Sequence, residues 1–210
     1  GFSIVSFTGN GSSDQQVGHG LATTPTCYIT KDRTNGSTNW HYHTTQIDGG
    51  MDYAFLNATN AFSSSSLSTP SSTTIRVGGT INTSSANFIS YVFAEKKGYS
   101  KFGSFSGNSS TNGSFVFCGF RPAMVICKAS STSGDWKMFD SKRIGYNAAN
   151  YRLQPNSSAA ETSDNLIDFL SNGFKLRTSS DSINTASTVI YLAFAEQPLV
   201  GTNNIPATAR

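Results

Sequence analysis

The sequence predicts an all-β protein of two tandem β-sandwich or jelly-roll-like modules related by internal duplication. Short apolar runs alternate with turn residues along nearly the whole chain, which is typical of sandwiches and jelly rolls. Aromatic residues make up 12% of the 210 residues, enough to build a core and to argue against disorder. Segments of the first half recur in the second half.

The recurrence runs from end to end at a nearly constant offset. The run Ser-Phe-Thr-Gly-Asn at 6–10 returns as Ser-Phe-Ser-Gly-Asn at 104–108, and Phe-Ala-Glu at 93–95 returns at 194–196. We therefore expect one module over 1–97, a second over 98–198 and a C-terminal tail over 199–210 that drapes over a neighbour or stays mobile. A single closed sandwich built from two half-sheets is the alternative.

The first module contains six strand-like runs separated by turn signals such as Asn35-Gly36 and Asp48-Gly49-Gly50. We expect strands over 3–7, 27–31, 40–43, 53–56, 74–77 and 88–94.

The second module repeats the pattern. We expect strands over 102–105, 114–117, 123–128, 136–139, 151–153, 174–177 and 189–194, whereas 161–170 could form a helical turn.

Composition excludes several classes of protein. Charged residues are only 13% of the chain, and the net charge of +3 contains no basic block, so nucleic acid is not an expected partner. No run reaches the length of a membrane span, and the chain begins with a strand-like run rather than a signal peptide, so we expect a soluble fragment or mature segment of a larger protein. The three cysteines have neither disulfide-framework nor metal spacing. No cofactor is expected.

His41 and His43 are the residues most indicative of a metal site. Imidazoles at i and i+2 face the same side of a strand and could share a metal, with His19, Asp48 or Asp52 completing the set. The second module carries Lys137 and Phe139 at these places, so the fold does not need the histidines. We therefore favour solvent-facing histidines over a metal site.

Aromatic residues near loops are candidates for stacking on sugar rings. Trp40 and Trp136 occupy the same place in both modules, which favours burial of both. Better candidates differ between the modules and have amide or carboxylate neighbours that could bond sugar hydroxyls. These candidates are Tyr42, Tyr53, Tyr146 and Tyr151, with Asn39, Asp48, Asn147 and Asn150.

Glu95 and Glu196 could be read as the carboxylate pair of a glycoside hydrolase. The duplication relates them, however, so each ends the last strand of its own module. We expect cross-strand ion pairs with Lys31 and Lys128 instead, and no catalytic residues.

Several runs resemble a domain found near the C-termini of structural proteins of tailed bacteriophages, often tail fibres and often from marine phages. The runs lie at 7–11, 18–21, 98–108, 119–123, 168–177 and 193–196, and the resemblance covers essentially the whole chain. It implies a virion location, on the tail or another surface appendage, with other virion subunits as partners. It also implies a homo-oligomer, of which a trimer is one form.

Three functional hypotheses follow. The first is receptor binding by a non-catalytic virion domain whose polar, Tyr-bearing loops contact a host-surface polysaccharide or outer-membrane protein. The second is an architectural or decoration domain without a ligand. A polysaccharide depolymerase ranks last for want of an acid pair.

Overall fold

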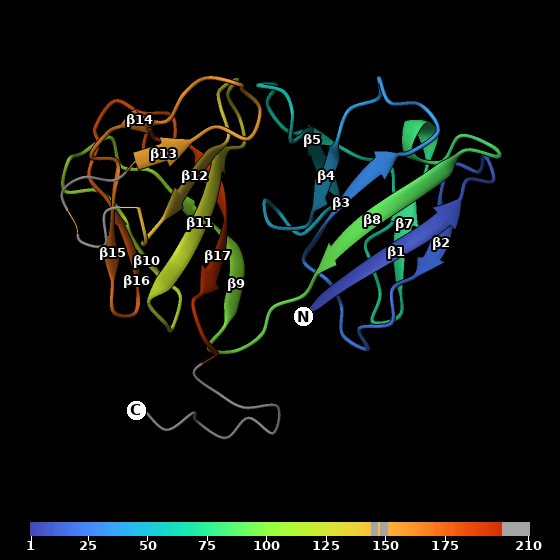
Figure 1. Ribbon diagram of the computed structural model, residues 1–210, viewed down its shortest axis with the longest axis horizontal. Helices are drawn as coiled ribbons and strands as arrows, with labels where there is room; N and C mark the ends of the chain where they lie inside the picture. Colours follow the sequence, from blue (N-terminus) through green and yellow to red (C-terminus); the bar gives the residue numbers. More distant parts are fainter. Residues whose placement is uncertain (144–146, 148–150, 199–210) are drawn as a thin grey trace. The chain divides into compact units, whose positions relative to one another are not determined.

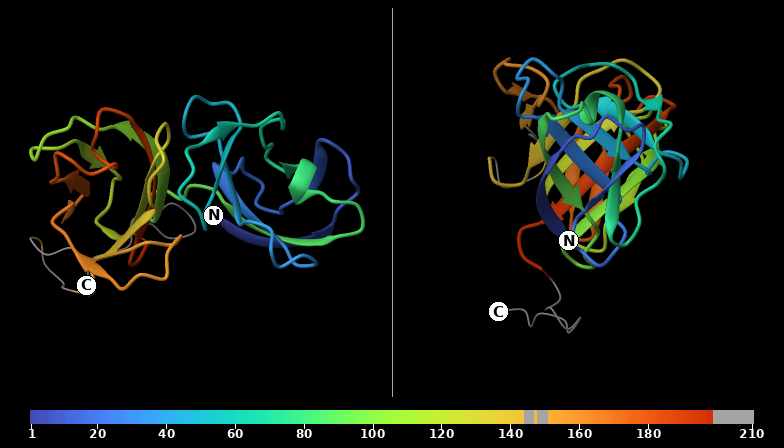
Figure 2. Two further views of the ribbon diagram at one scale, coloured as in Figure 1. Left: turned by 90° about the horizontal axis from the view of Figure 1, so that it is seen from above. Right: turned by 90° about the vertical axis from the view of Figure 1, so that its right-hand side faces the viewer.

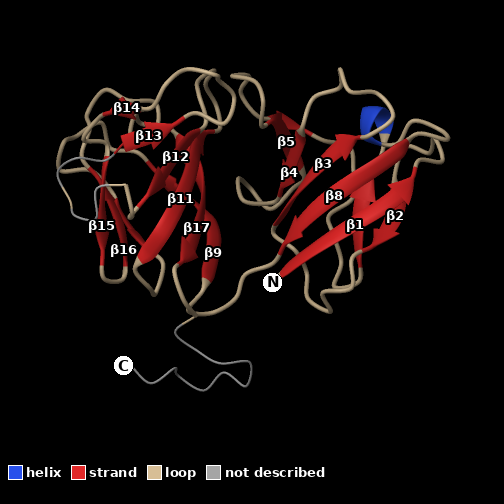
Figure 3. Ribbon diagram, viewed as in Figure 1, coloured by secondary structure: helices blue, strands red, loops and turns tan. Residues whose placement is uncertain are grey.

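The computed structural model describes residues 1–143, 147 and 151–198. These residues form strands joined by turns, and the only helical element among them is the short 3-10 turn η1 (Gly79–Ile81), drawn in blue in Figure 3. The prediction of an all-β fold is confirmed. No helix in the described part of the chain has the length and apolar character that crossing a membrane requires.

The chain divides into two compact units, Gly1–Glu95 (unit 1) and Lys96–Arg210 (unit 2). The division falls two residues before the boundary that the sequence repeat predicts.

Unit 1 contains a six-stranded antiparallel sheet and a two-stranded one (Figure 1). The large sheet has the order β1 (Phe2–Thr8), β8 (Asn87–Phe93), β3 (Cys27–Asp32), β4 (His41–Thr44), β5 (Asp52–Phe55) and β6 (Ser63–Ser64). The small sheet pairs β2 (Gln15–Gly18) with β7 (Thr74–Val77).

The core of unit 1 lies between these two sheets, which can be followed from two more directions in Figure 2. Phe88 and Val92 of β8 lie on the same side of the large sheet because strand residues alternate between faces. They form one buried cluster with Ile75 and Val77 of β7 and with Tyr28 of β3. Apolar burial between facing sheets is the main stabilising term in such a sandwich.

Unit 2 is built in the same way. Its six-stranded sheet has the order β9 (Ser100–Ser106), β17 (Thr188–Ala195), β11 (Pro122–Ala129), β12 (Lys137–Asp140), β13 (Tyr151–Leu153) and β14 (Thr162–Ser163). The smaller sheet has the order β10 (Phe115–Phe117), β16 (Gly173–Leu176) and β15 (Ile167–Leu170).

The helical turn considered for 161–170 is wrong, because this segment supplies β14 and β15. Ile167 and Asp168 pair with Leu176 and Lys175 across an antiparallel ladder, so the backbone polar groups are satisfied by the neighbouring strand rather than within a helix.

The large sheets of the two units have the same strand order when β1, β8, β3, β4, β5 and β6 are matched with β9, β17, β11, β12, β13 and β14. This agreement supports the interpretation of the sequence repeat as a duplication.

The recurring Gly-Asn motif forms the same clamp in each unit. The Asn82 side chain accepts a hydrogen bond from the Asn10 backbone N–H (3.1 Å) and donates to Asn10 Oδ1 and to the Ser12 carbonyl (2.9 Å each). In unit 2, Asn184 accepts from the Asn108 N–H (3.2 Å) and donates to Asn108 Oδ1 and the Ser110 carbonyl. Both clamp asparagines are fully buried.

The predicted burial of both tryptophans holds for one of them. Trp136 is fully buried, whereas Trp40 is 36% exposed and stacks on Tyr91 with ring centroids 6.3 Å apart. Their backbones are equivalent all the same, since the N–H of Trp40 donates to Asn57 and that of Trp136 donates to Asn156.

The expected ion pair of Lys31 with Glu95 is wrong because of strand register. Lys31 lies opposite Ile89, six residues before Glu95, and that separation along a strand is about 20 Å. The Lys31 ammonium donates to the carbonyls of Gly36 and Thr38 instead.

The matching pair in unit 2 is excluded by the same register. Lys128 lies opposite Ile190, six residues before Glu196, and donates to the Gly134 carbonyl, while Glu196 pairs with Lys142 at 2.6 Å.

Candidate functional site

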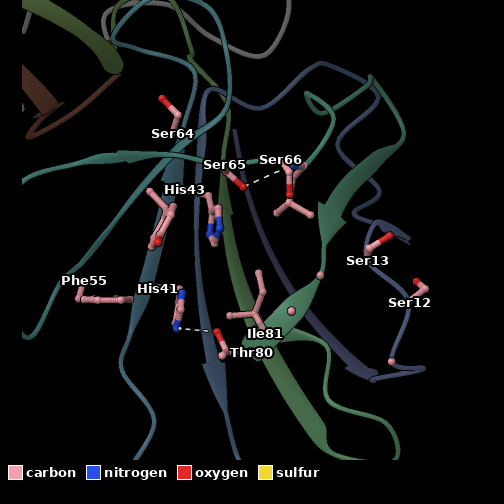
Figure 4. Close-up of a pocket in the computed structure, with 15 residues that line it drawn as sticks. Ser12, Ser13, His41, His43, Phe55, Ser64, Ser65, Ser66, Thr80 and Ile81 are labelled. Carbon is pink, nitrogen blue, oxygen red and sulfur yellow. Dashed lines mark hydrogen bonds between the residues drawn. The ribbon is translucent and has the colours of Figure 1, made fainter.

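A cavity of about 670 Å³ opens within unit 1, between the inner face of β4 and β5 and the loop that follows β7. Its size is within the range of small-ligand sites. The close-up in Figure 4 shows the imidazoles of His41 and His43 on the same side of β4, with Thr80 and Ile81 nearby. The lining residues are Gly11, Ser12, Ser13, His41, His43, Tyr53, Phe55, Ser64, Ser65, Ser66, Leu67, Gly78, Gly79, Thr80 and Ile81.

Strand register places the two histidines on the inner face. His43 lies opposite Tyr28 of β3, whose buried ring belongs to the core, and opposite Tyr53 of β5. His41 is two residues away on the same strand and shares that face. The prediction of solvent-facing histidines is therefore wrong: His41 is 9% and His43 is 3% exposed.

Ring stacking fixes the orientation of the imidazoles. The His43 ring lies nearly parallel to that of Tyr28, with centroids 5.1 Å apart and an interplanar angle of 7°. His41 stacks on His43 at 6.0 Å and on Tyr53 at 6.2 Å. These contacts hold a flat aromatic wall on one side of the cavity.

Burial keeps both imidazoles uncharged at neutral pH. It lowers the pKa of His41 to about 4, with the nearby charge of Lys31 acting in the same direction. Burial, followed by the neighbouring His41, lowers the pKa of His43 to about 3. A neutral imidazole offers one N–H donor and one acceptor nitrogen.

The protein leaves part of this hydrogen-bonding capacity unused. His41 Nε2 is 3.4 Å from Thr80 Oγ1, a long contact, and the buried Nδ1 of His43 has no hydrogen-bond partner. Buried polar atoms are nearly always paired in folded proteins, and an unpaired one costs about 1–3 kcal/mol. Both histidines line the cavity, so their rings are candidates for ligand binding.

Two loops meet at the rim of the cavity because glycine allows it. A Cβ atom at Gly78 would lie 2.0 Å from the Ser13 carbonyl oxygen, so only glycine permits this approach. The Asn82 clamp orders the same loop through the Ser12 carbonyl. Ser12 and Ser13 thereby line the cavity together with Ser65, Ser66 and Thr80, whereas the hydroxyl of Ser64, which also lines it, bonds to the Asp52 carboxyl.

The structure does not assemble the predicted metal ligands. His19 is buried among other partners, since its Nε2 lies 3.2 Å from the Ser71 carbonyl and its Nδ1 accepts a hydrogen bond from the Leu21 N–H. Asp48 is exposed and accepts a hydrogen bond from the Gly50 N–H. Among the described residues, no three His, Cys, Asp or Glu side chains are grouped closely enough to hold a metal ion.

Of the candidate sugar-binding residues in unit 1, Tyr53 lines the cavity. Tyr42 is contradicted as a surface contact: it points to the opposite face of β4, is 1% exposed and donates its hydroxyl to Gln46 at 2.5 Å. Asn39 accepts a hydrogen bond from Asn57, and Asp48 lies in the turn before β5. Neither of these two lines the cavity.

The described candidates in unit 2 are Asn147 and Tyr151. The Asn147 side chain donates to the Phe169 carbonyl and accepts from the Phe169 N–H, so it bonds to the backbone of β15. Tyr151 is half-buried at the start of β13. Tyr146 and Asn150 lie outside the described residues.

The sequence analysis missed most of the cavity. Phe55, Thr80 and the serines at 12–13 and 64–66 looked like ordinary strand and loop residues. The available signal was the difference between the modules, because the positions of His41 and His43 are occupied by Lys137 and Phe139 in the second one.

Comparison with known proteins places the chain in a family without adding a function. The model of a family described as a domain of unknown function (DUF7483) matches residues 1–198. No curated protein and no solved structure matches the chain.

Proposed function

We propose that this chain, which belongs to the DUF7483 domain family, is a non-catalytic binding domain that recognises a hydroxyl-rich ligand in the cavity of unit 1. The ligand class is a glycan of the bacterial surface. The observation that carries the proposal is the cavity wall, where stacked neutral imidazoles with unused hydrogen-bonding capacity adjoin serine and threonine residues.

Each part of the wall suits one part of a sugar. The hydroxyls of Ser12, Ser13 and Thr80 and the imidazole of His43 can exchange hydrogen bonds with sugar hydroxyls. The rings of Tyr53 and Phe55 can cover the C–H face of a pyranose. The residues that line the cavity include no Asp or Glu, so the wall provides binding groups rather than the carboxylate pair of a glycosidase.

The biological setting is proposed from the resemblance to domains of tailed-phage structural proteins. In that setting the chain is a virion domain on a tail fibre or another surface appendage, and a homo-oligomer would present several cavities at once. A weak individual site then gains strength by avidity.

The test is binding of the fluorescently labelled full chain to a panel of bacterial strains, with extracted surface polysaccharide as competitor. Saturable binding that the polysaccharide abolishes supports the proposal, and the variant His43→Phe should bind at least tenfold more weakly. Binding that the polysaccharide leaves intact refutes a glycan ligand and indicates a protein receptor. A chain that binds no strain and no polysaccharide refutes receptor recognition for that panel.

An architectural role is the second candidate function. Phe2 and Ile4 of edge strand β1 are 53% and 58% exposed on the face of the large sheet that points away from the core of unit 1. Exposed apolar side chains of this kind are common in subunit contacts. Loss of oligomerisation in an Ile4→Ser variant, with glycan binding absent in both proteins, would favour this role.

A further inference from the structure

The two units differ in charge at the place where unit 1 has its cavity. The matching sheets and the shared asparagine clamp define which residues correspond. From the strand pairing within each unit, His41 corresponds to Lys137 and Tyr53 corresponds to Arg152. The bridges to the short strands β6 and β14 match Ser64 with Ser163, so the residues that follow, Ser65 and Asp164, also correspond.

The loop that contains Asn82 in unit 1 corresponds to the loop that contains Asn184 in unit 2. The fully buried clamp asparagines Asn82 and Asn184 are equivalent, and each donates its backbone N–H to the carbonyl three residues earlier. Those earlier residues are Gly79 in unit 1 and Asp181 in unit 2. At all four places, therefore, a neutral residue of unit 1 corresponds to a charged residue of unit 2.

In unit 2 the four charged residues are joined as two ion pairs. Lys137 Nζ lies 2.6 Å from Asp181 Oδ2, and Arg152 Nε lies 2.6 Å from Asp164 Oδ2. Phe139, at the place of His43, is fully buried in the core of that unit. Thus unit 2 has two ion pairs and a buried phenylalanine at the positions that correspond to the cavity wall of unit 1.

We infer that the cavity of unit 1 selects an uncharged saccharide and discriminates against acidic ones, an inference that rests on the proposed glycan-binding function. The lining residues include no Lys, Arg, Asp or Glu. A carboxylate, sulfate or phosphate on a ligand would lose its hydration there without gaining an ionic partner, and burial of an unpaired charge is strongly unfavourable. Recognition of such anions usually relies on Arg or Lys.

The hydrogen-bonding groups of the wall agree with this selectivity. Burial lowers the pKa values of His41 and His43 far below neutrality, so neither ring supplies a positive charge to an acidic sugar. Serine and threonine hydroxyls and neutral imidazoles can each donate and accept, which matches the hydroxyls of a neutral sugar.

The test compares neutral and acidic glycans on one array, probed with the full labelled chain. The array carries neutral hexose and N-acetylhexosamine oligosaccharides beside sialylated, uronate-containing and phosphorylated ones. We expect binding to members of the neutral set, and at least tenfold weaker binding when a carboxylate or phosphate is added to the same saccharide.

Variants assign the binding to the cavity. Tyr53→Arg/Ser65→Asp installs the unit 2 ion pair and should weaken neutral-glycan binding at least tenfold. The control Thr23→Arg/Ser72→Asp adds the same charges at exposed loop positions and should bind like the wild type. His43→Phe introduces the residue type that unit 2 has at the equivalent position, Phe139. It serves as a second cavity variant if the first fails to fold.

The outcomes separate the two proposals. Preference for acidic glycans that the cavity variants abolish would overturn the uncharged-ligand inference and leave the glycan-binding function standing. Glycan binding unchanged in both cavity variants would overturn the inference by locating the site elsewhere. Binding to no glycan of either set would overturn the proposed function, and the inference with it.

Discussion

Acidification should destabilise unit 1 through its two cavity histidines. In an unfolded chain a histidine has a pKa near 6.5, whereas burial lowers the pKa of His41 to about 4 and that of His43 to about 3. Between these values the unfolded state binds more protons than the folded one. The stability that neutral histidines provide is therefore complete above about pH 7 and falls as the pH decreases toward 4.

The magnitude follows from the linkage relation. One pH unit below the unfolded pKa costs about 1.4 kcal/mol for each group that stays neutral in the folded state. At pH 5.5 both histidines remain neutral in the folded protein, so lowering the pH from 7.5 to 5.5 should reduce the free energy of unfolding by about 3 kcal/mol.

Urea unfolding at the two pH values measures this change. The chain has two tryptophans, one in each unit, so in a Trp136→Phe background the fluorescence of Trp40 reports unit 1. The control replaces His41 with Gln and His43 with Phe in that background. Other groups contribute equally to both proteins, including Asp52, whose pKa is raised by burial and by Asp48, so the difference isolates the two rings.

The Trp136→Phe protein should lose about 3 kcal/mol more than its variant without the two histidines between pH 7.5 and 5.5. An equal loss in both proteins would refute the conclusion that these histidines are held neutral by burial.

Three further predictions concern the fold. Asn82→Ala should lower the free energy of unfolding of unit 1 by about 2–4 kcal/mol in the same urea assay, because it leaves the Asn10 N–H and the Ser12 carbonyl without their buried partner; a change below the error of the assay would contradict the clamp. Gly107→Ala should lower the melting temperature of unit 2, since its Cβ would lie 2.0 Å from the Thr185 carbonyl oxygen, whereas an unchanged melting curve would show that the loop adapts at no cost. Cys27 is fully buried, and burial raises the pKa of its thiol to about 12, so a thiol reagent should modify it only in denaturant; prompt labelling of the native chain, located by peptide mapping, would argue against that burial.

The strand pattern could be predicted because alternation and turn residues are local signals. The predicted strand 27–31 lies within β3, and the predicted strand 189–194 lies within β17. The helical turn over 161–170 failed because pairing of β15 with β16 outweighs a short segment's own preference.

The inward direction of the histidines could not be read from β4 itself. All four of its residues are buried, so the usual contrast between a polar and an apolar face is missing. From the sequence of β4 alone, either Tyr42 or the two histidines could point toward the core. The pairing of His43 with Tyr28 of β3 shows that the histidines do.

The cavity depends on contacts between distant segments. The loops at 11–13, 64–67 and 78–81 meet because Gly78 admits Ser13 closely and Asn82 binds Ser12. No local pattern encodes that meeting. The repeat shows that Lys137 stands at the place of His41. The sequence does not show that Lys137 forms an ion pair with Asp181 there.

Imidazole NMR of the full chain tests the central claim most directly, because the chain contains only three histidines. Ring nitrogen and carbon resonances are recorded while a neutral oligosaccharide that binds on the array is added. The account predicts saturable shifts for His41 and His43 and unchanged signals for His19, which lies outside the cavity lining. Binding that leaves His41 and His43 unshifted would contradict the account.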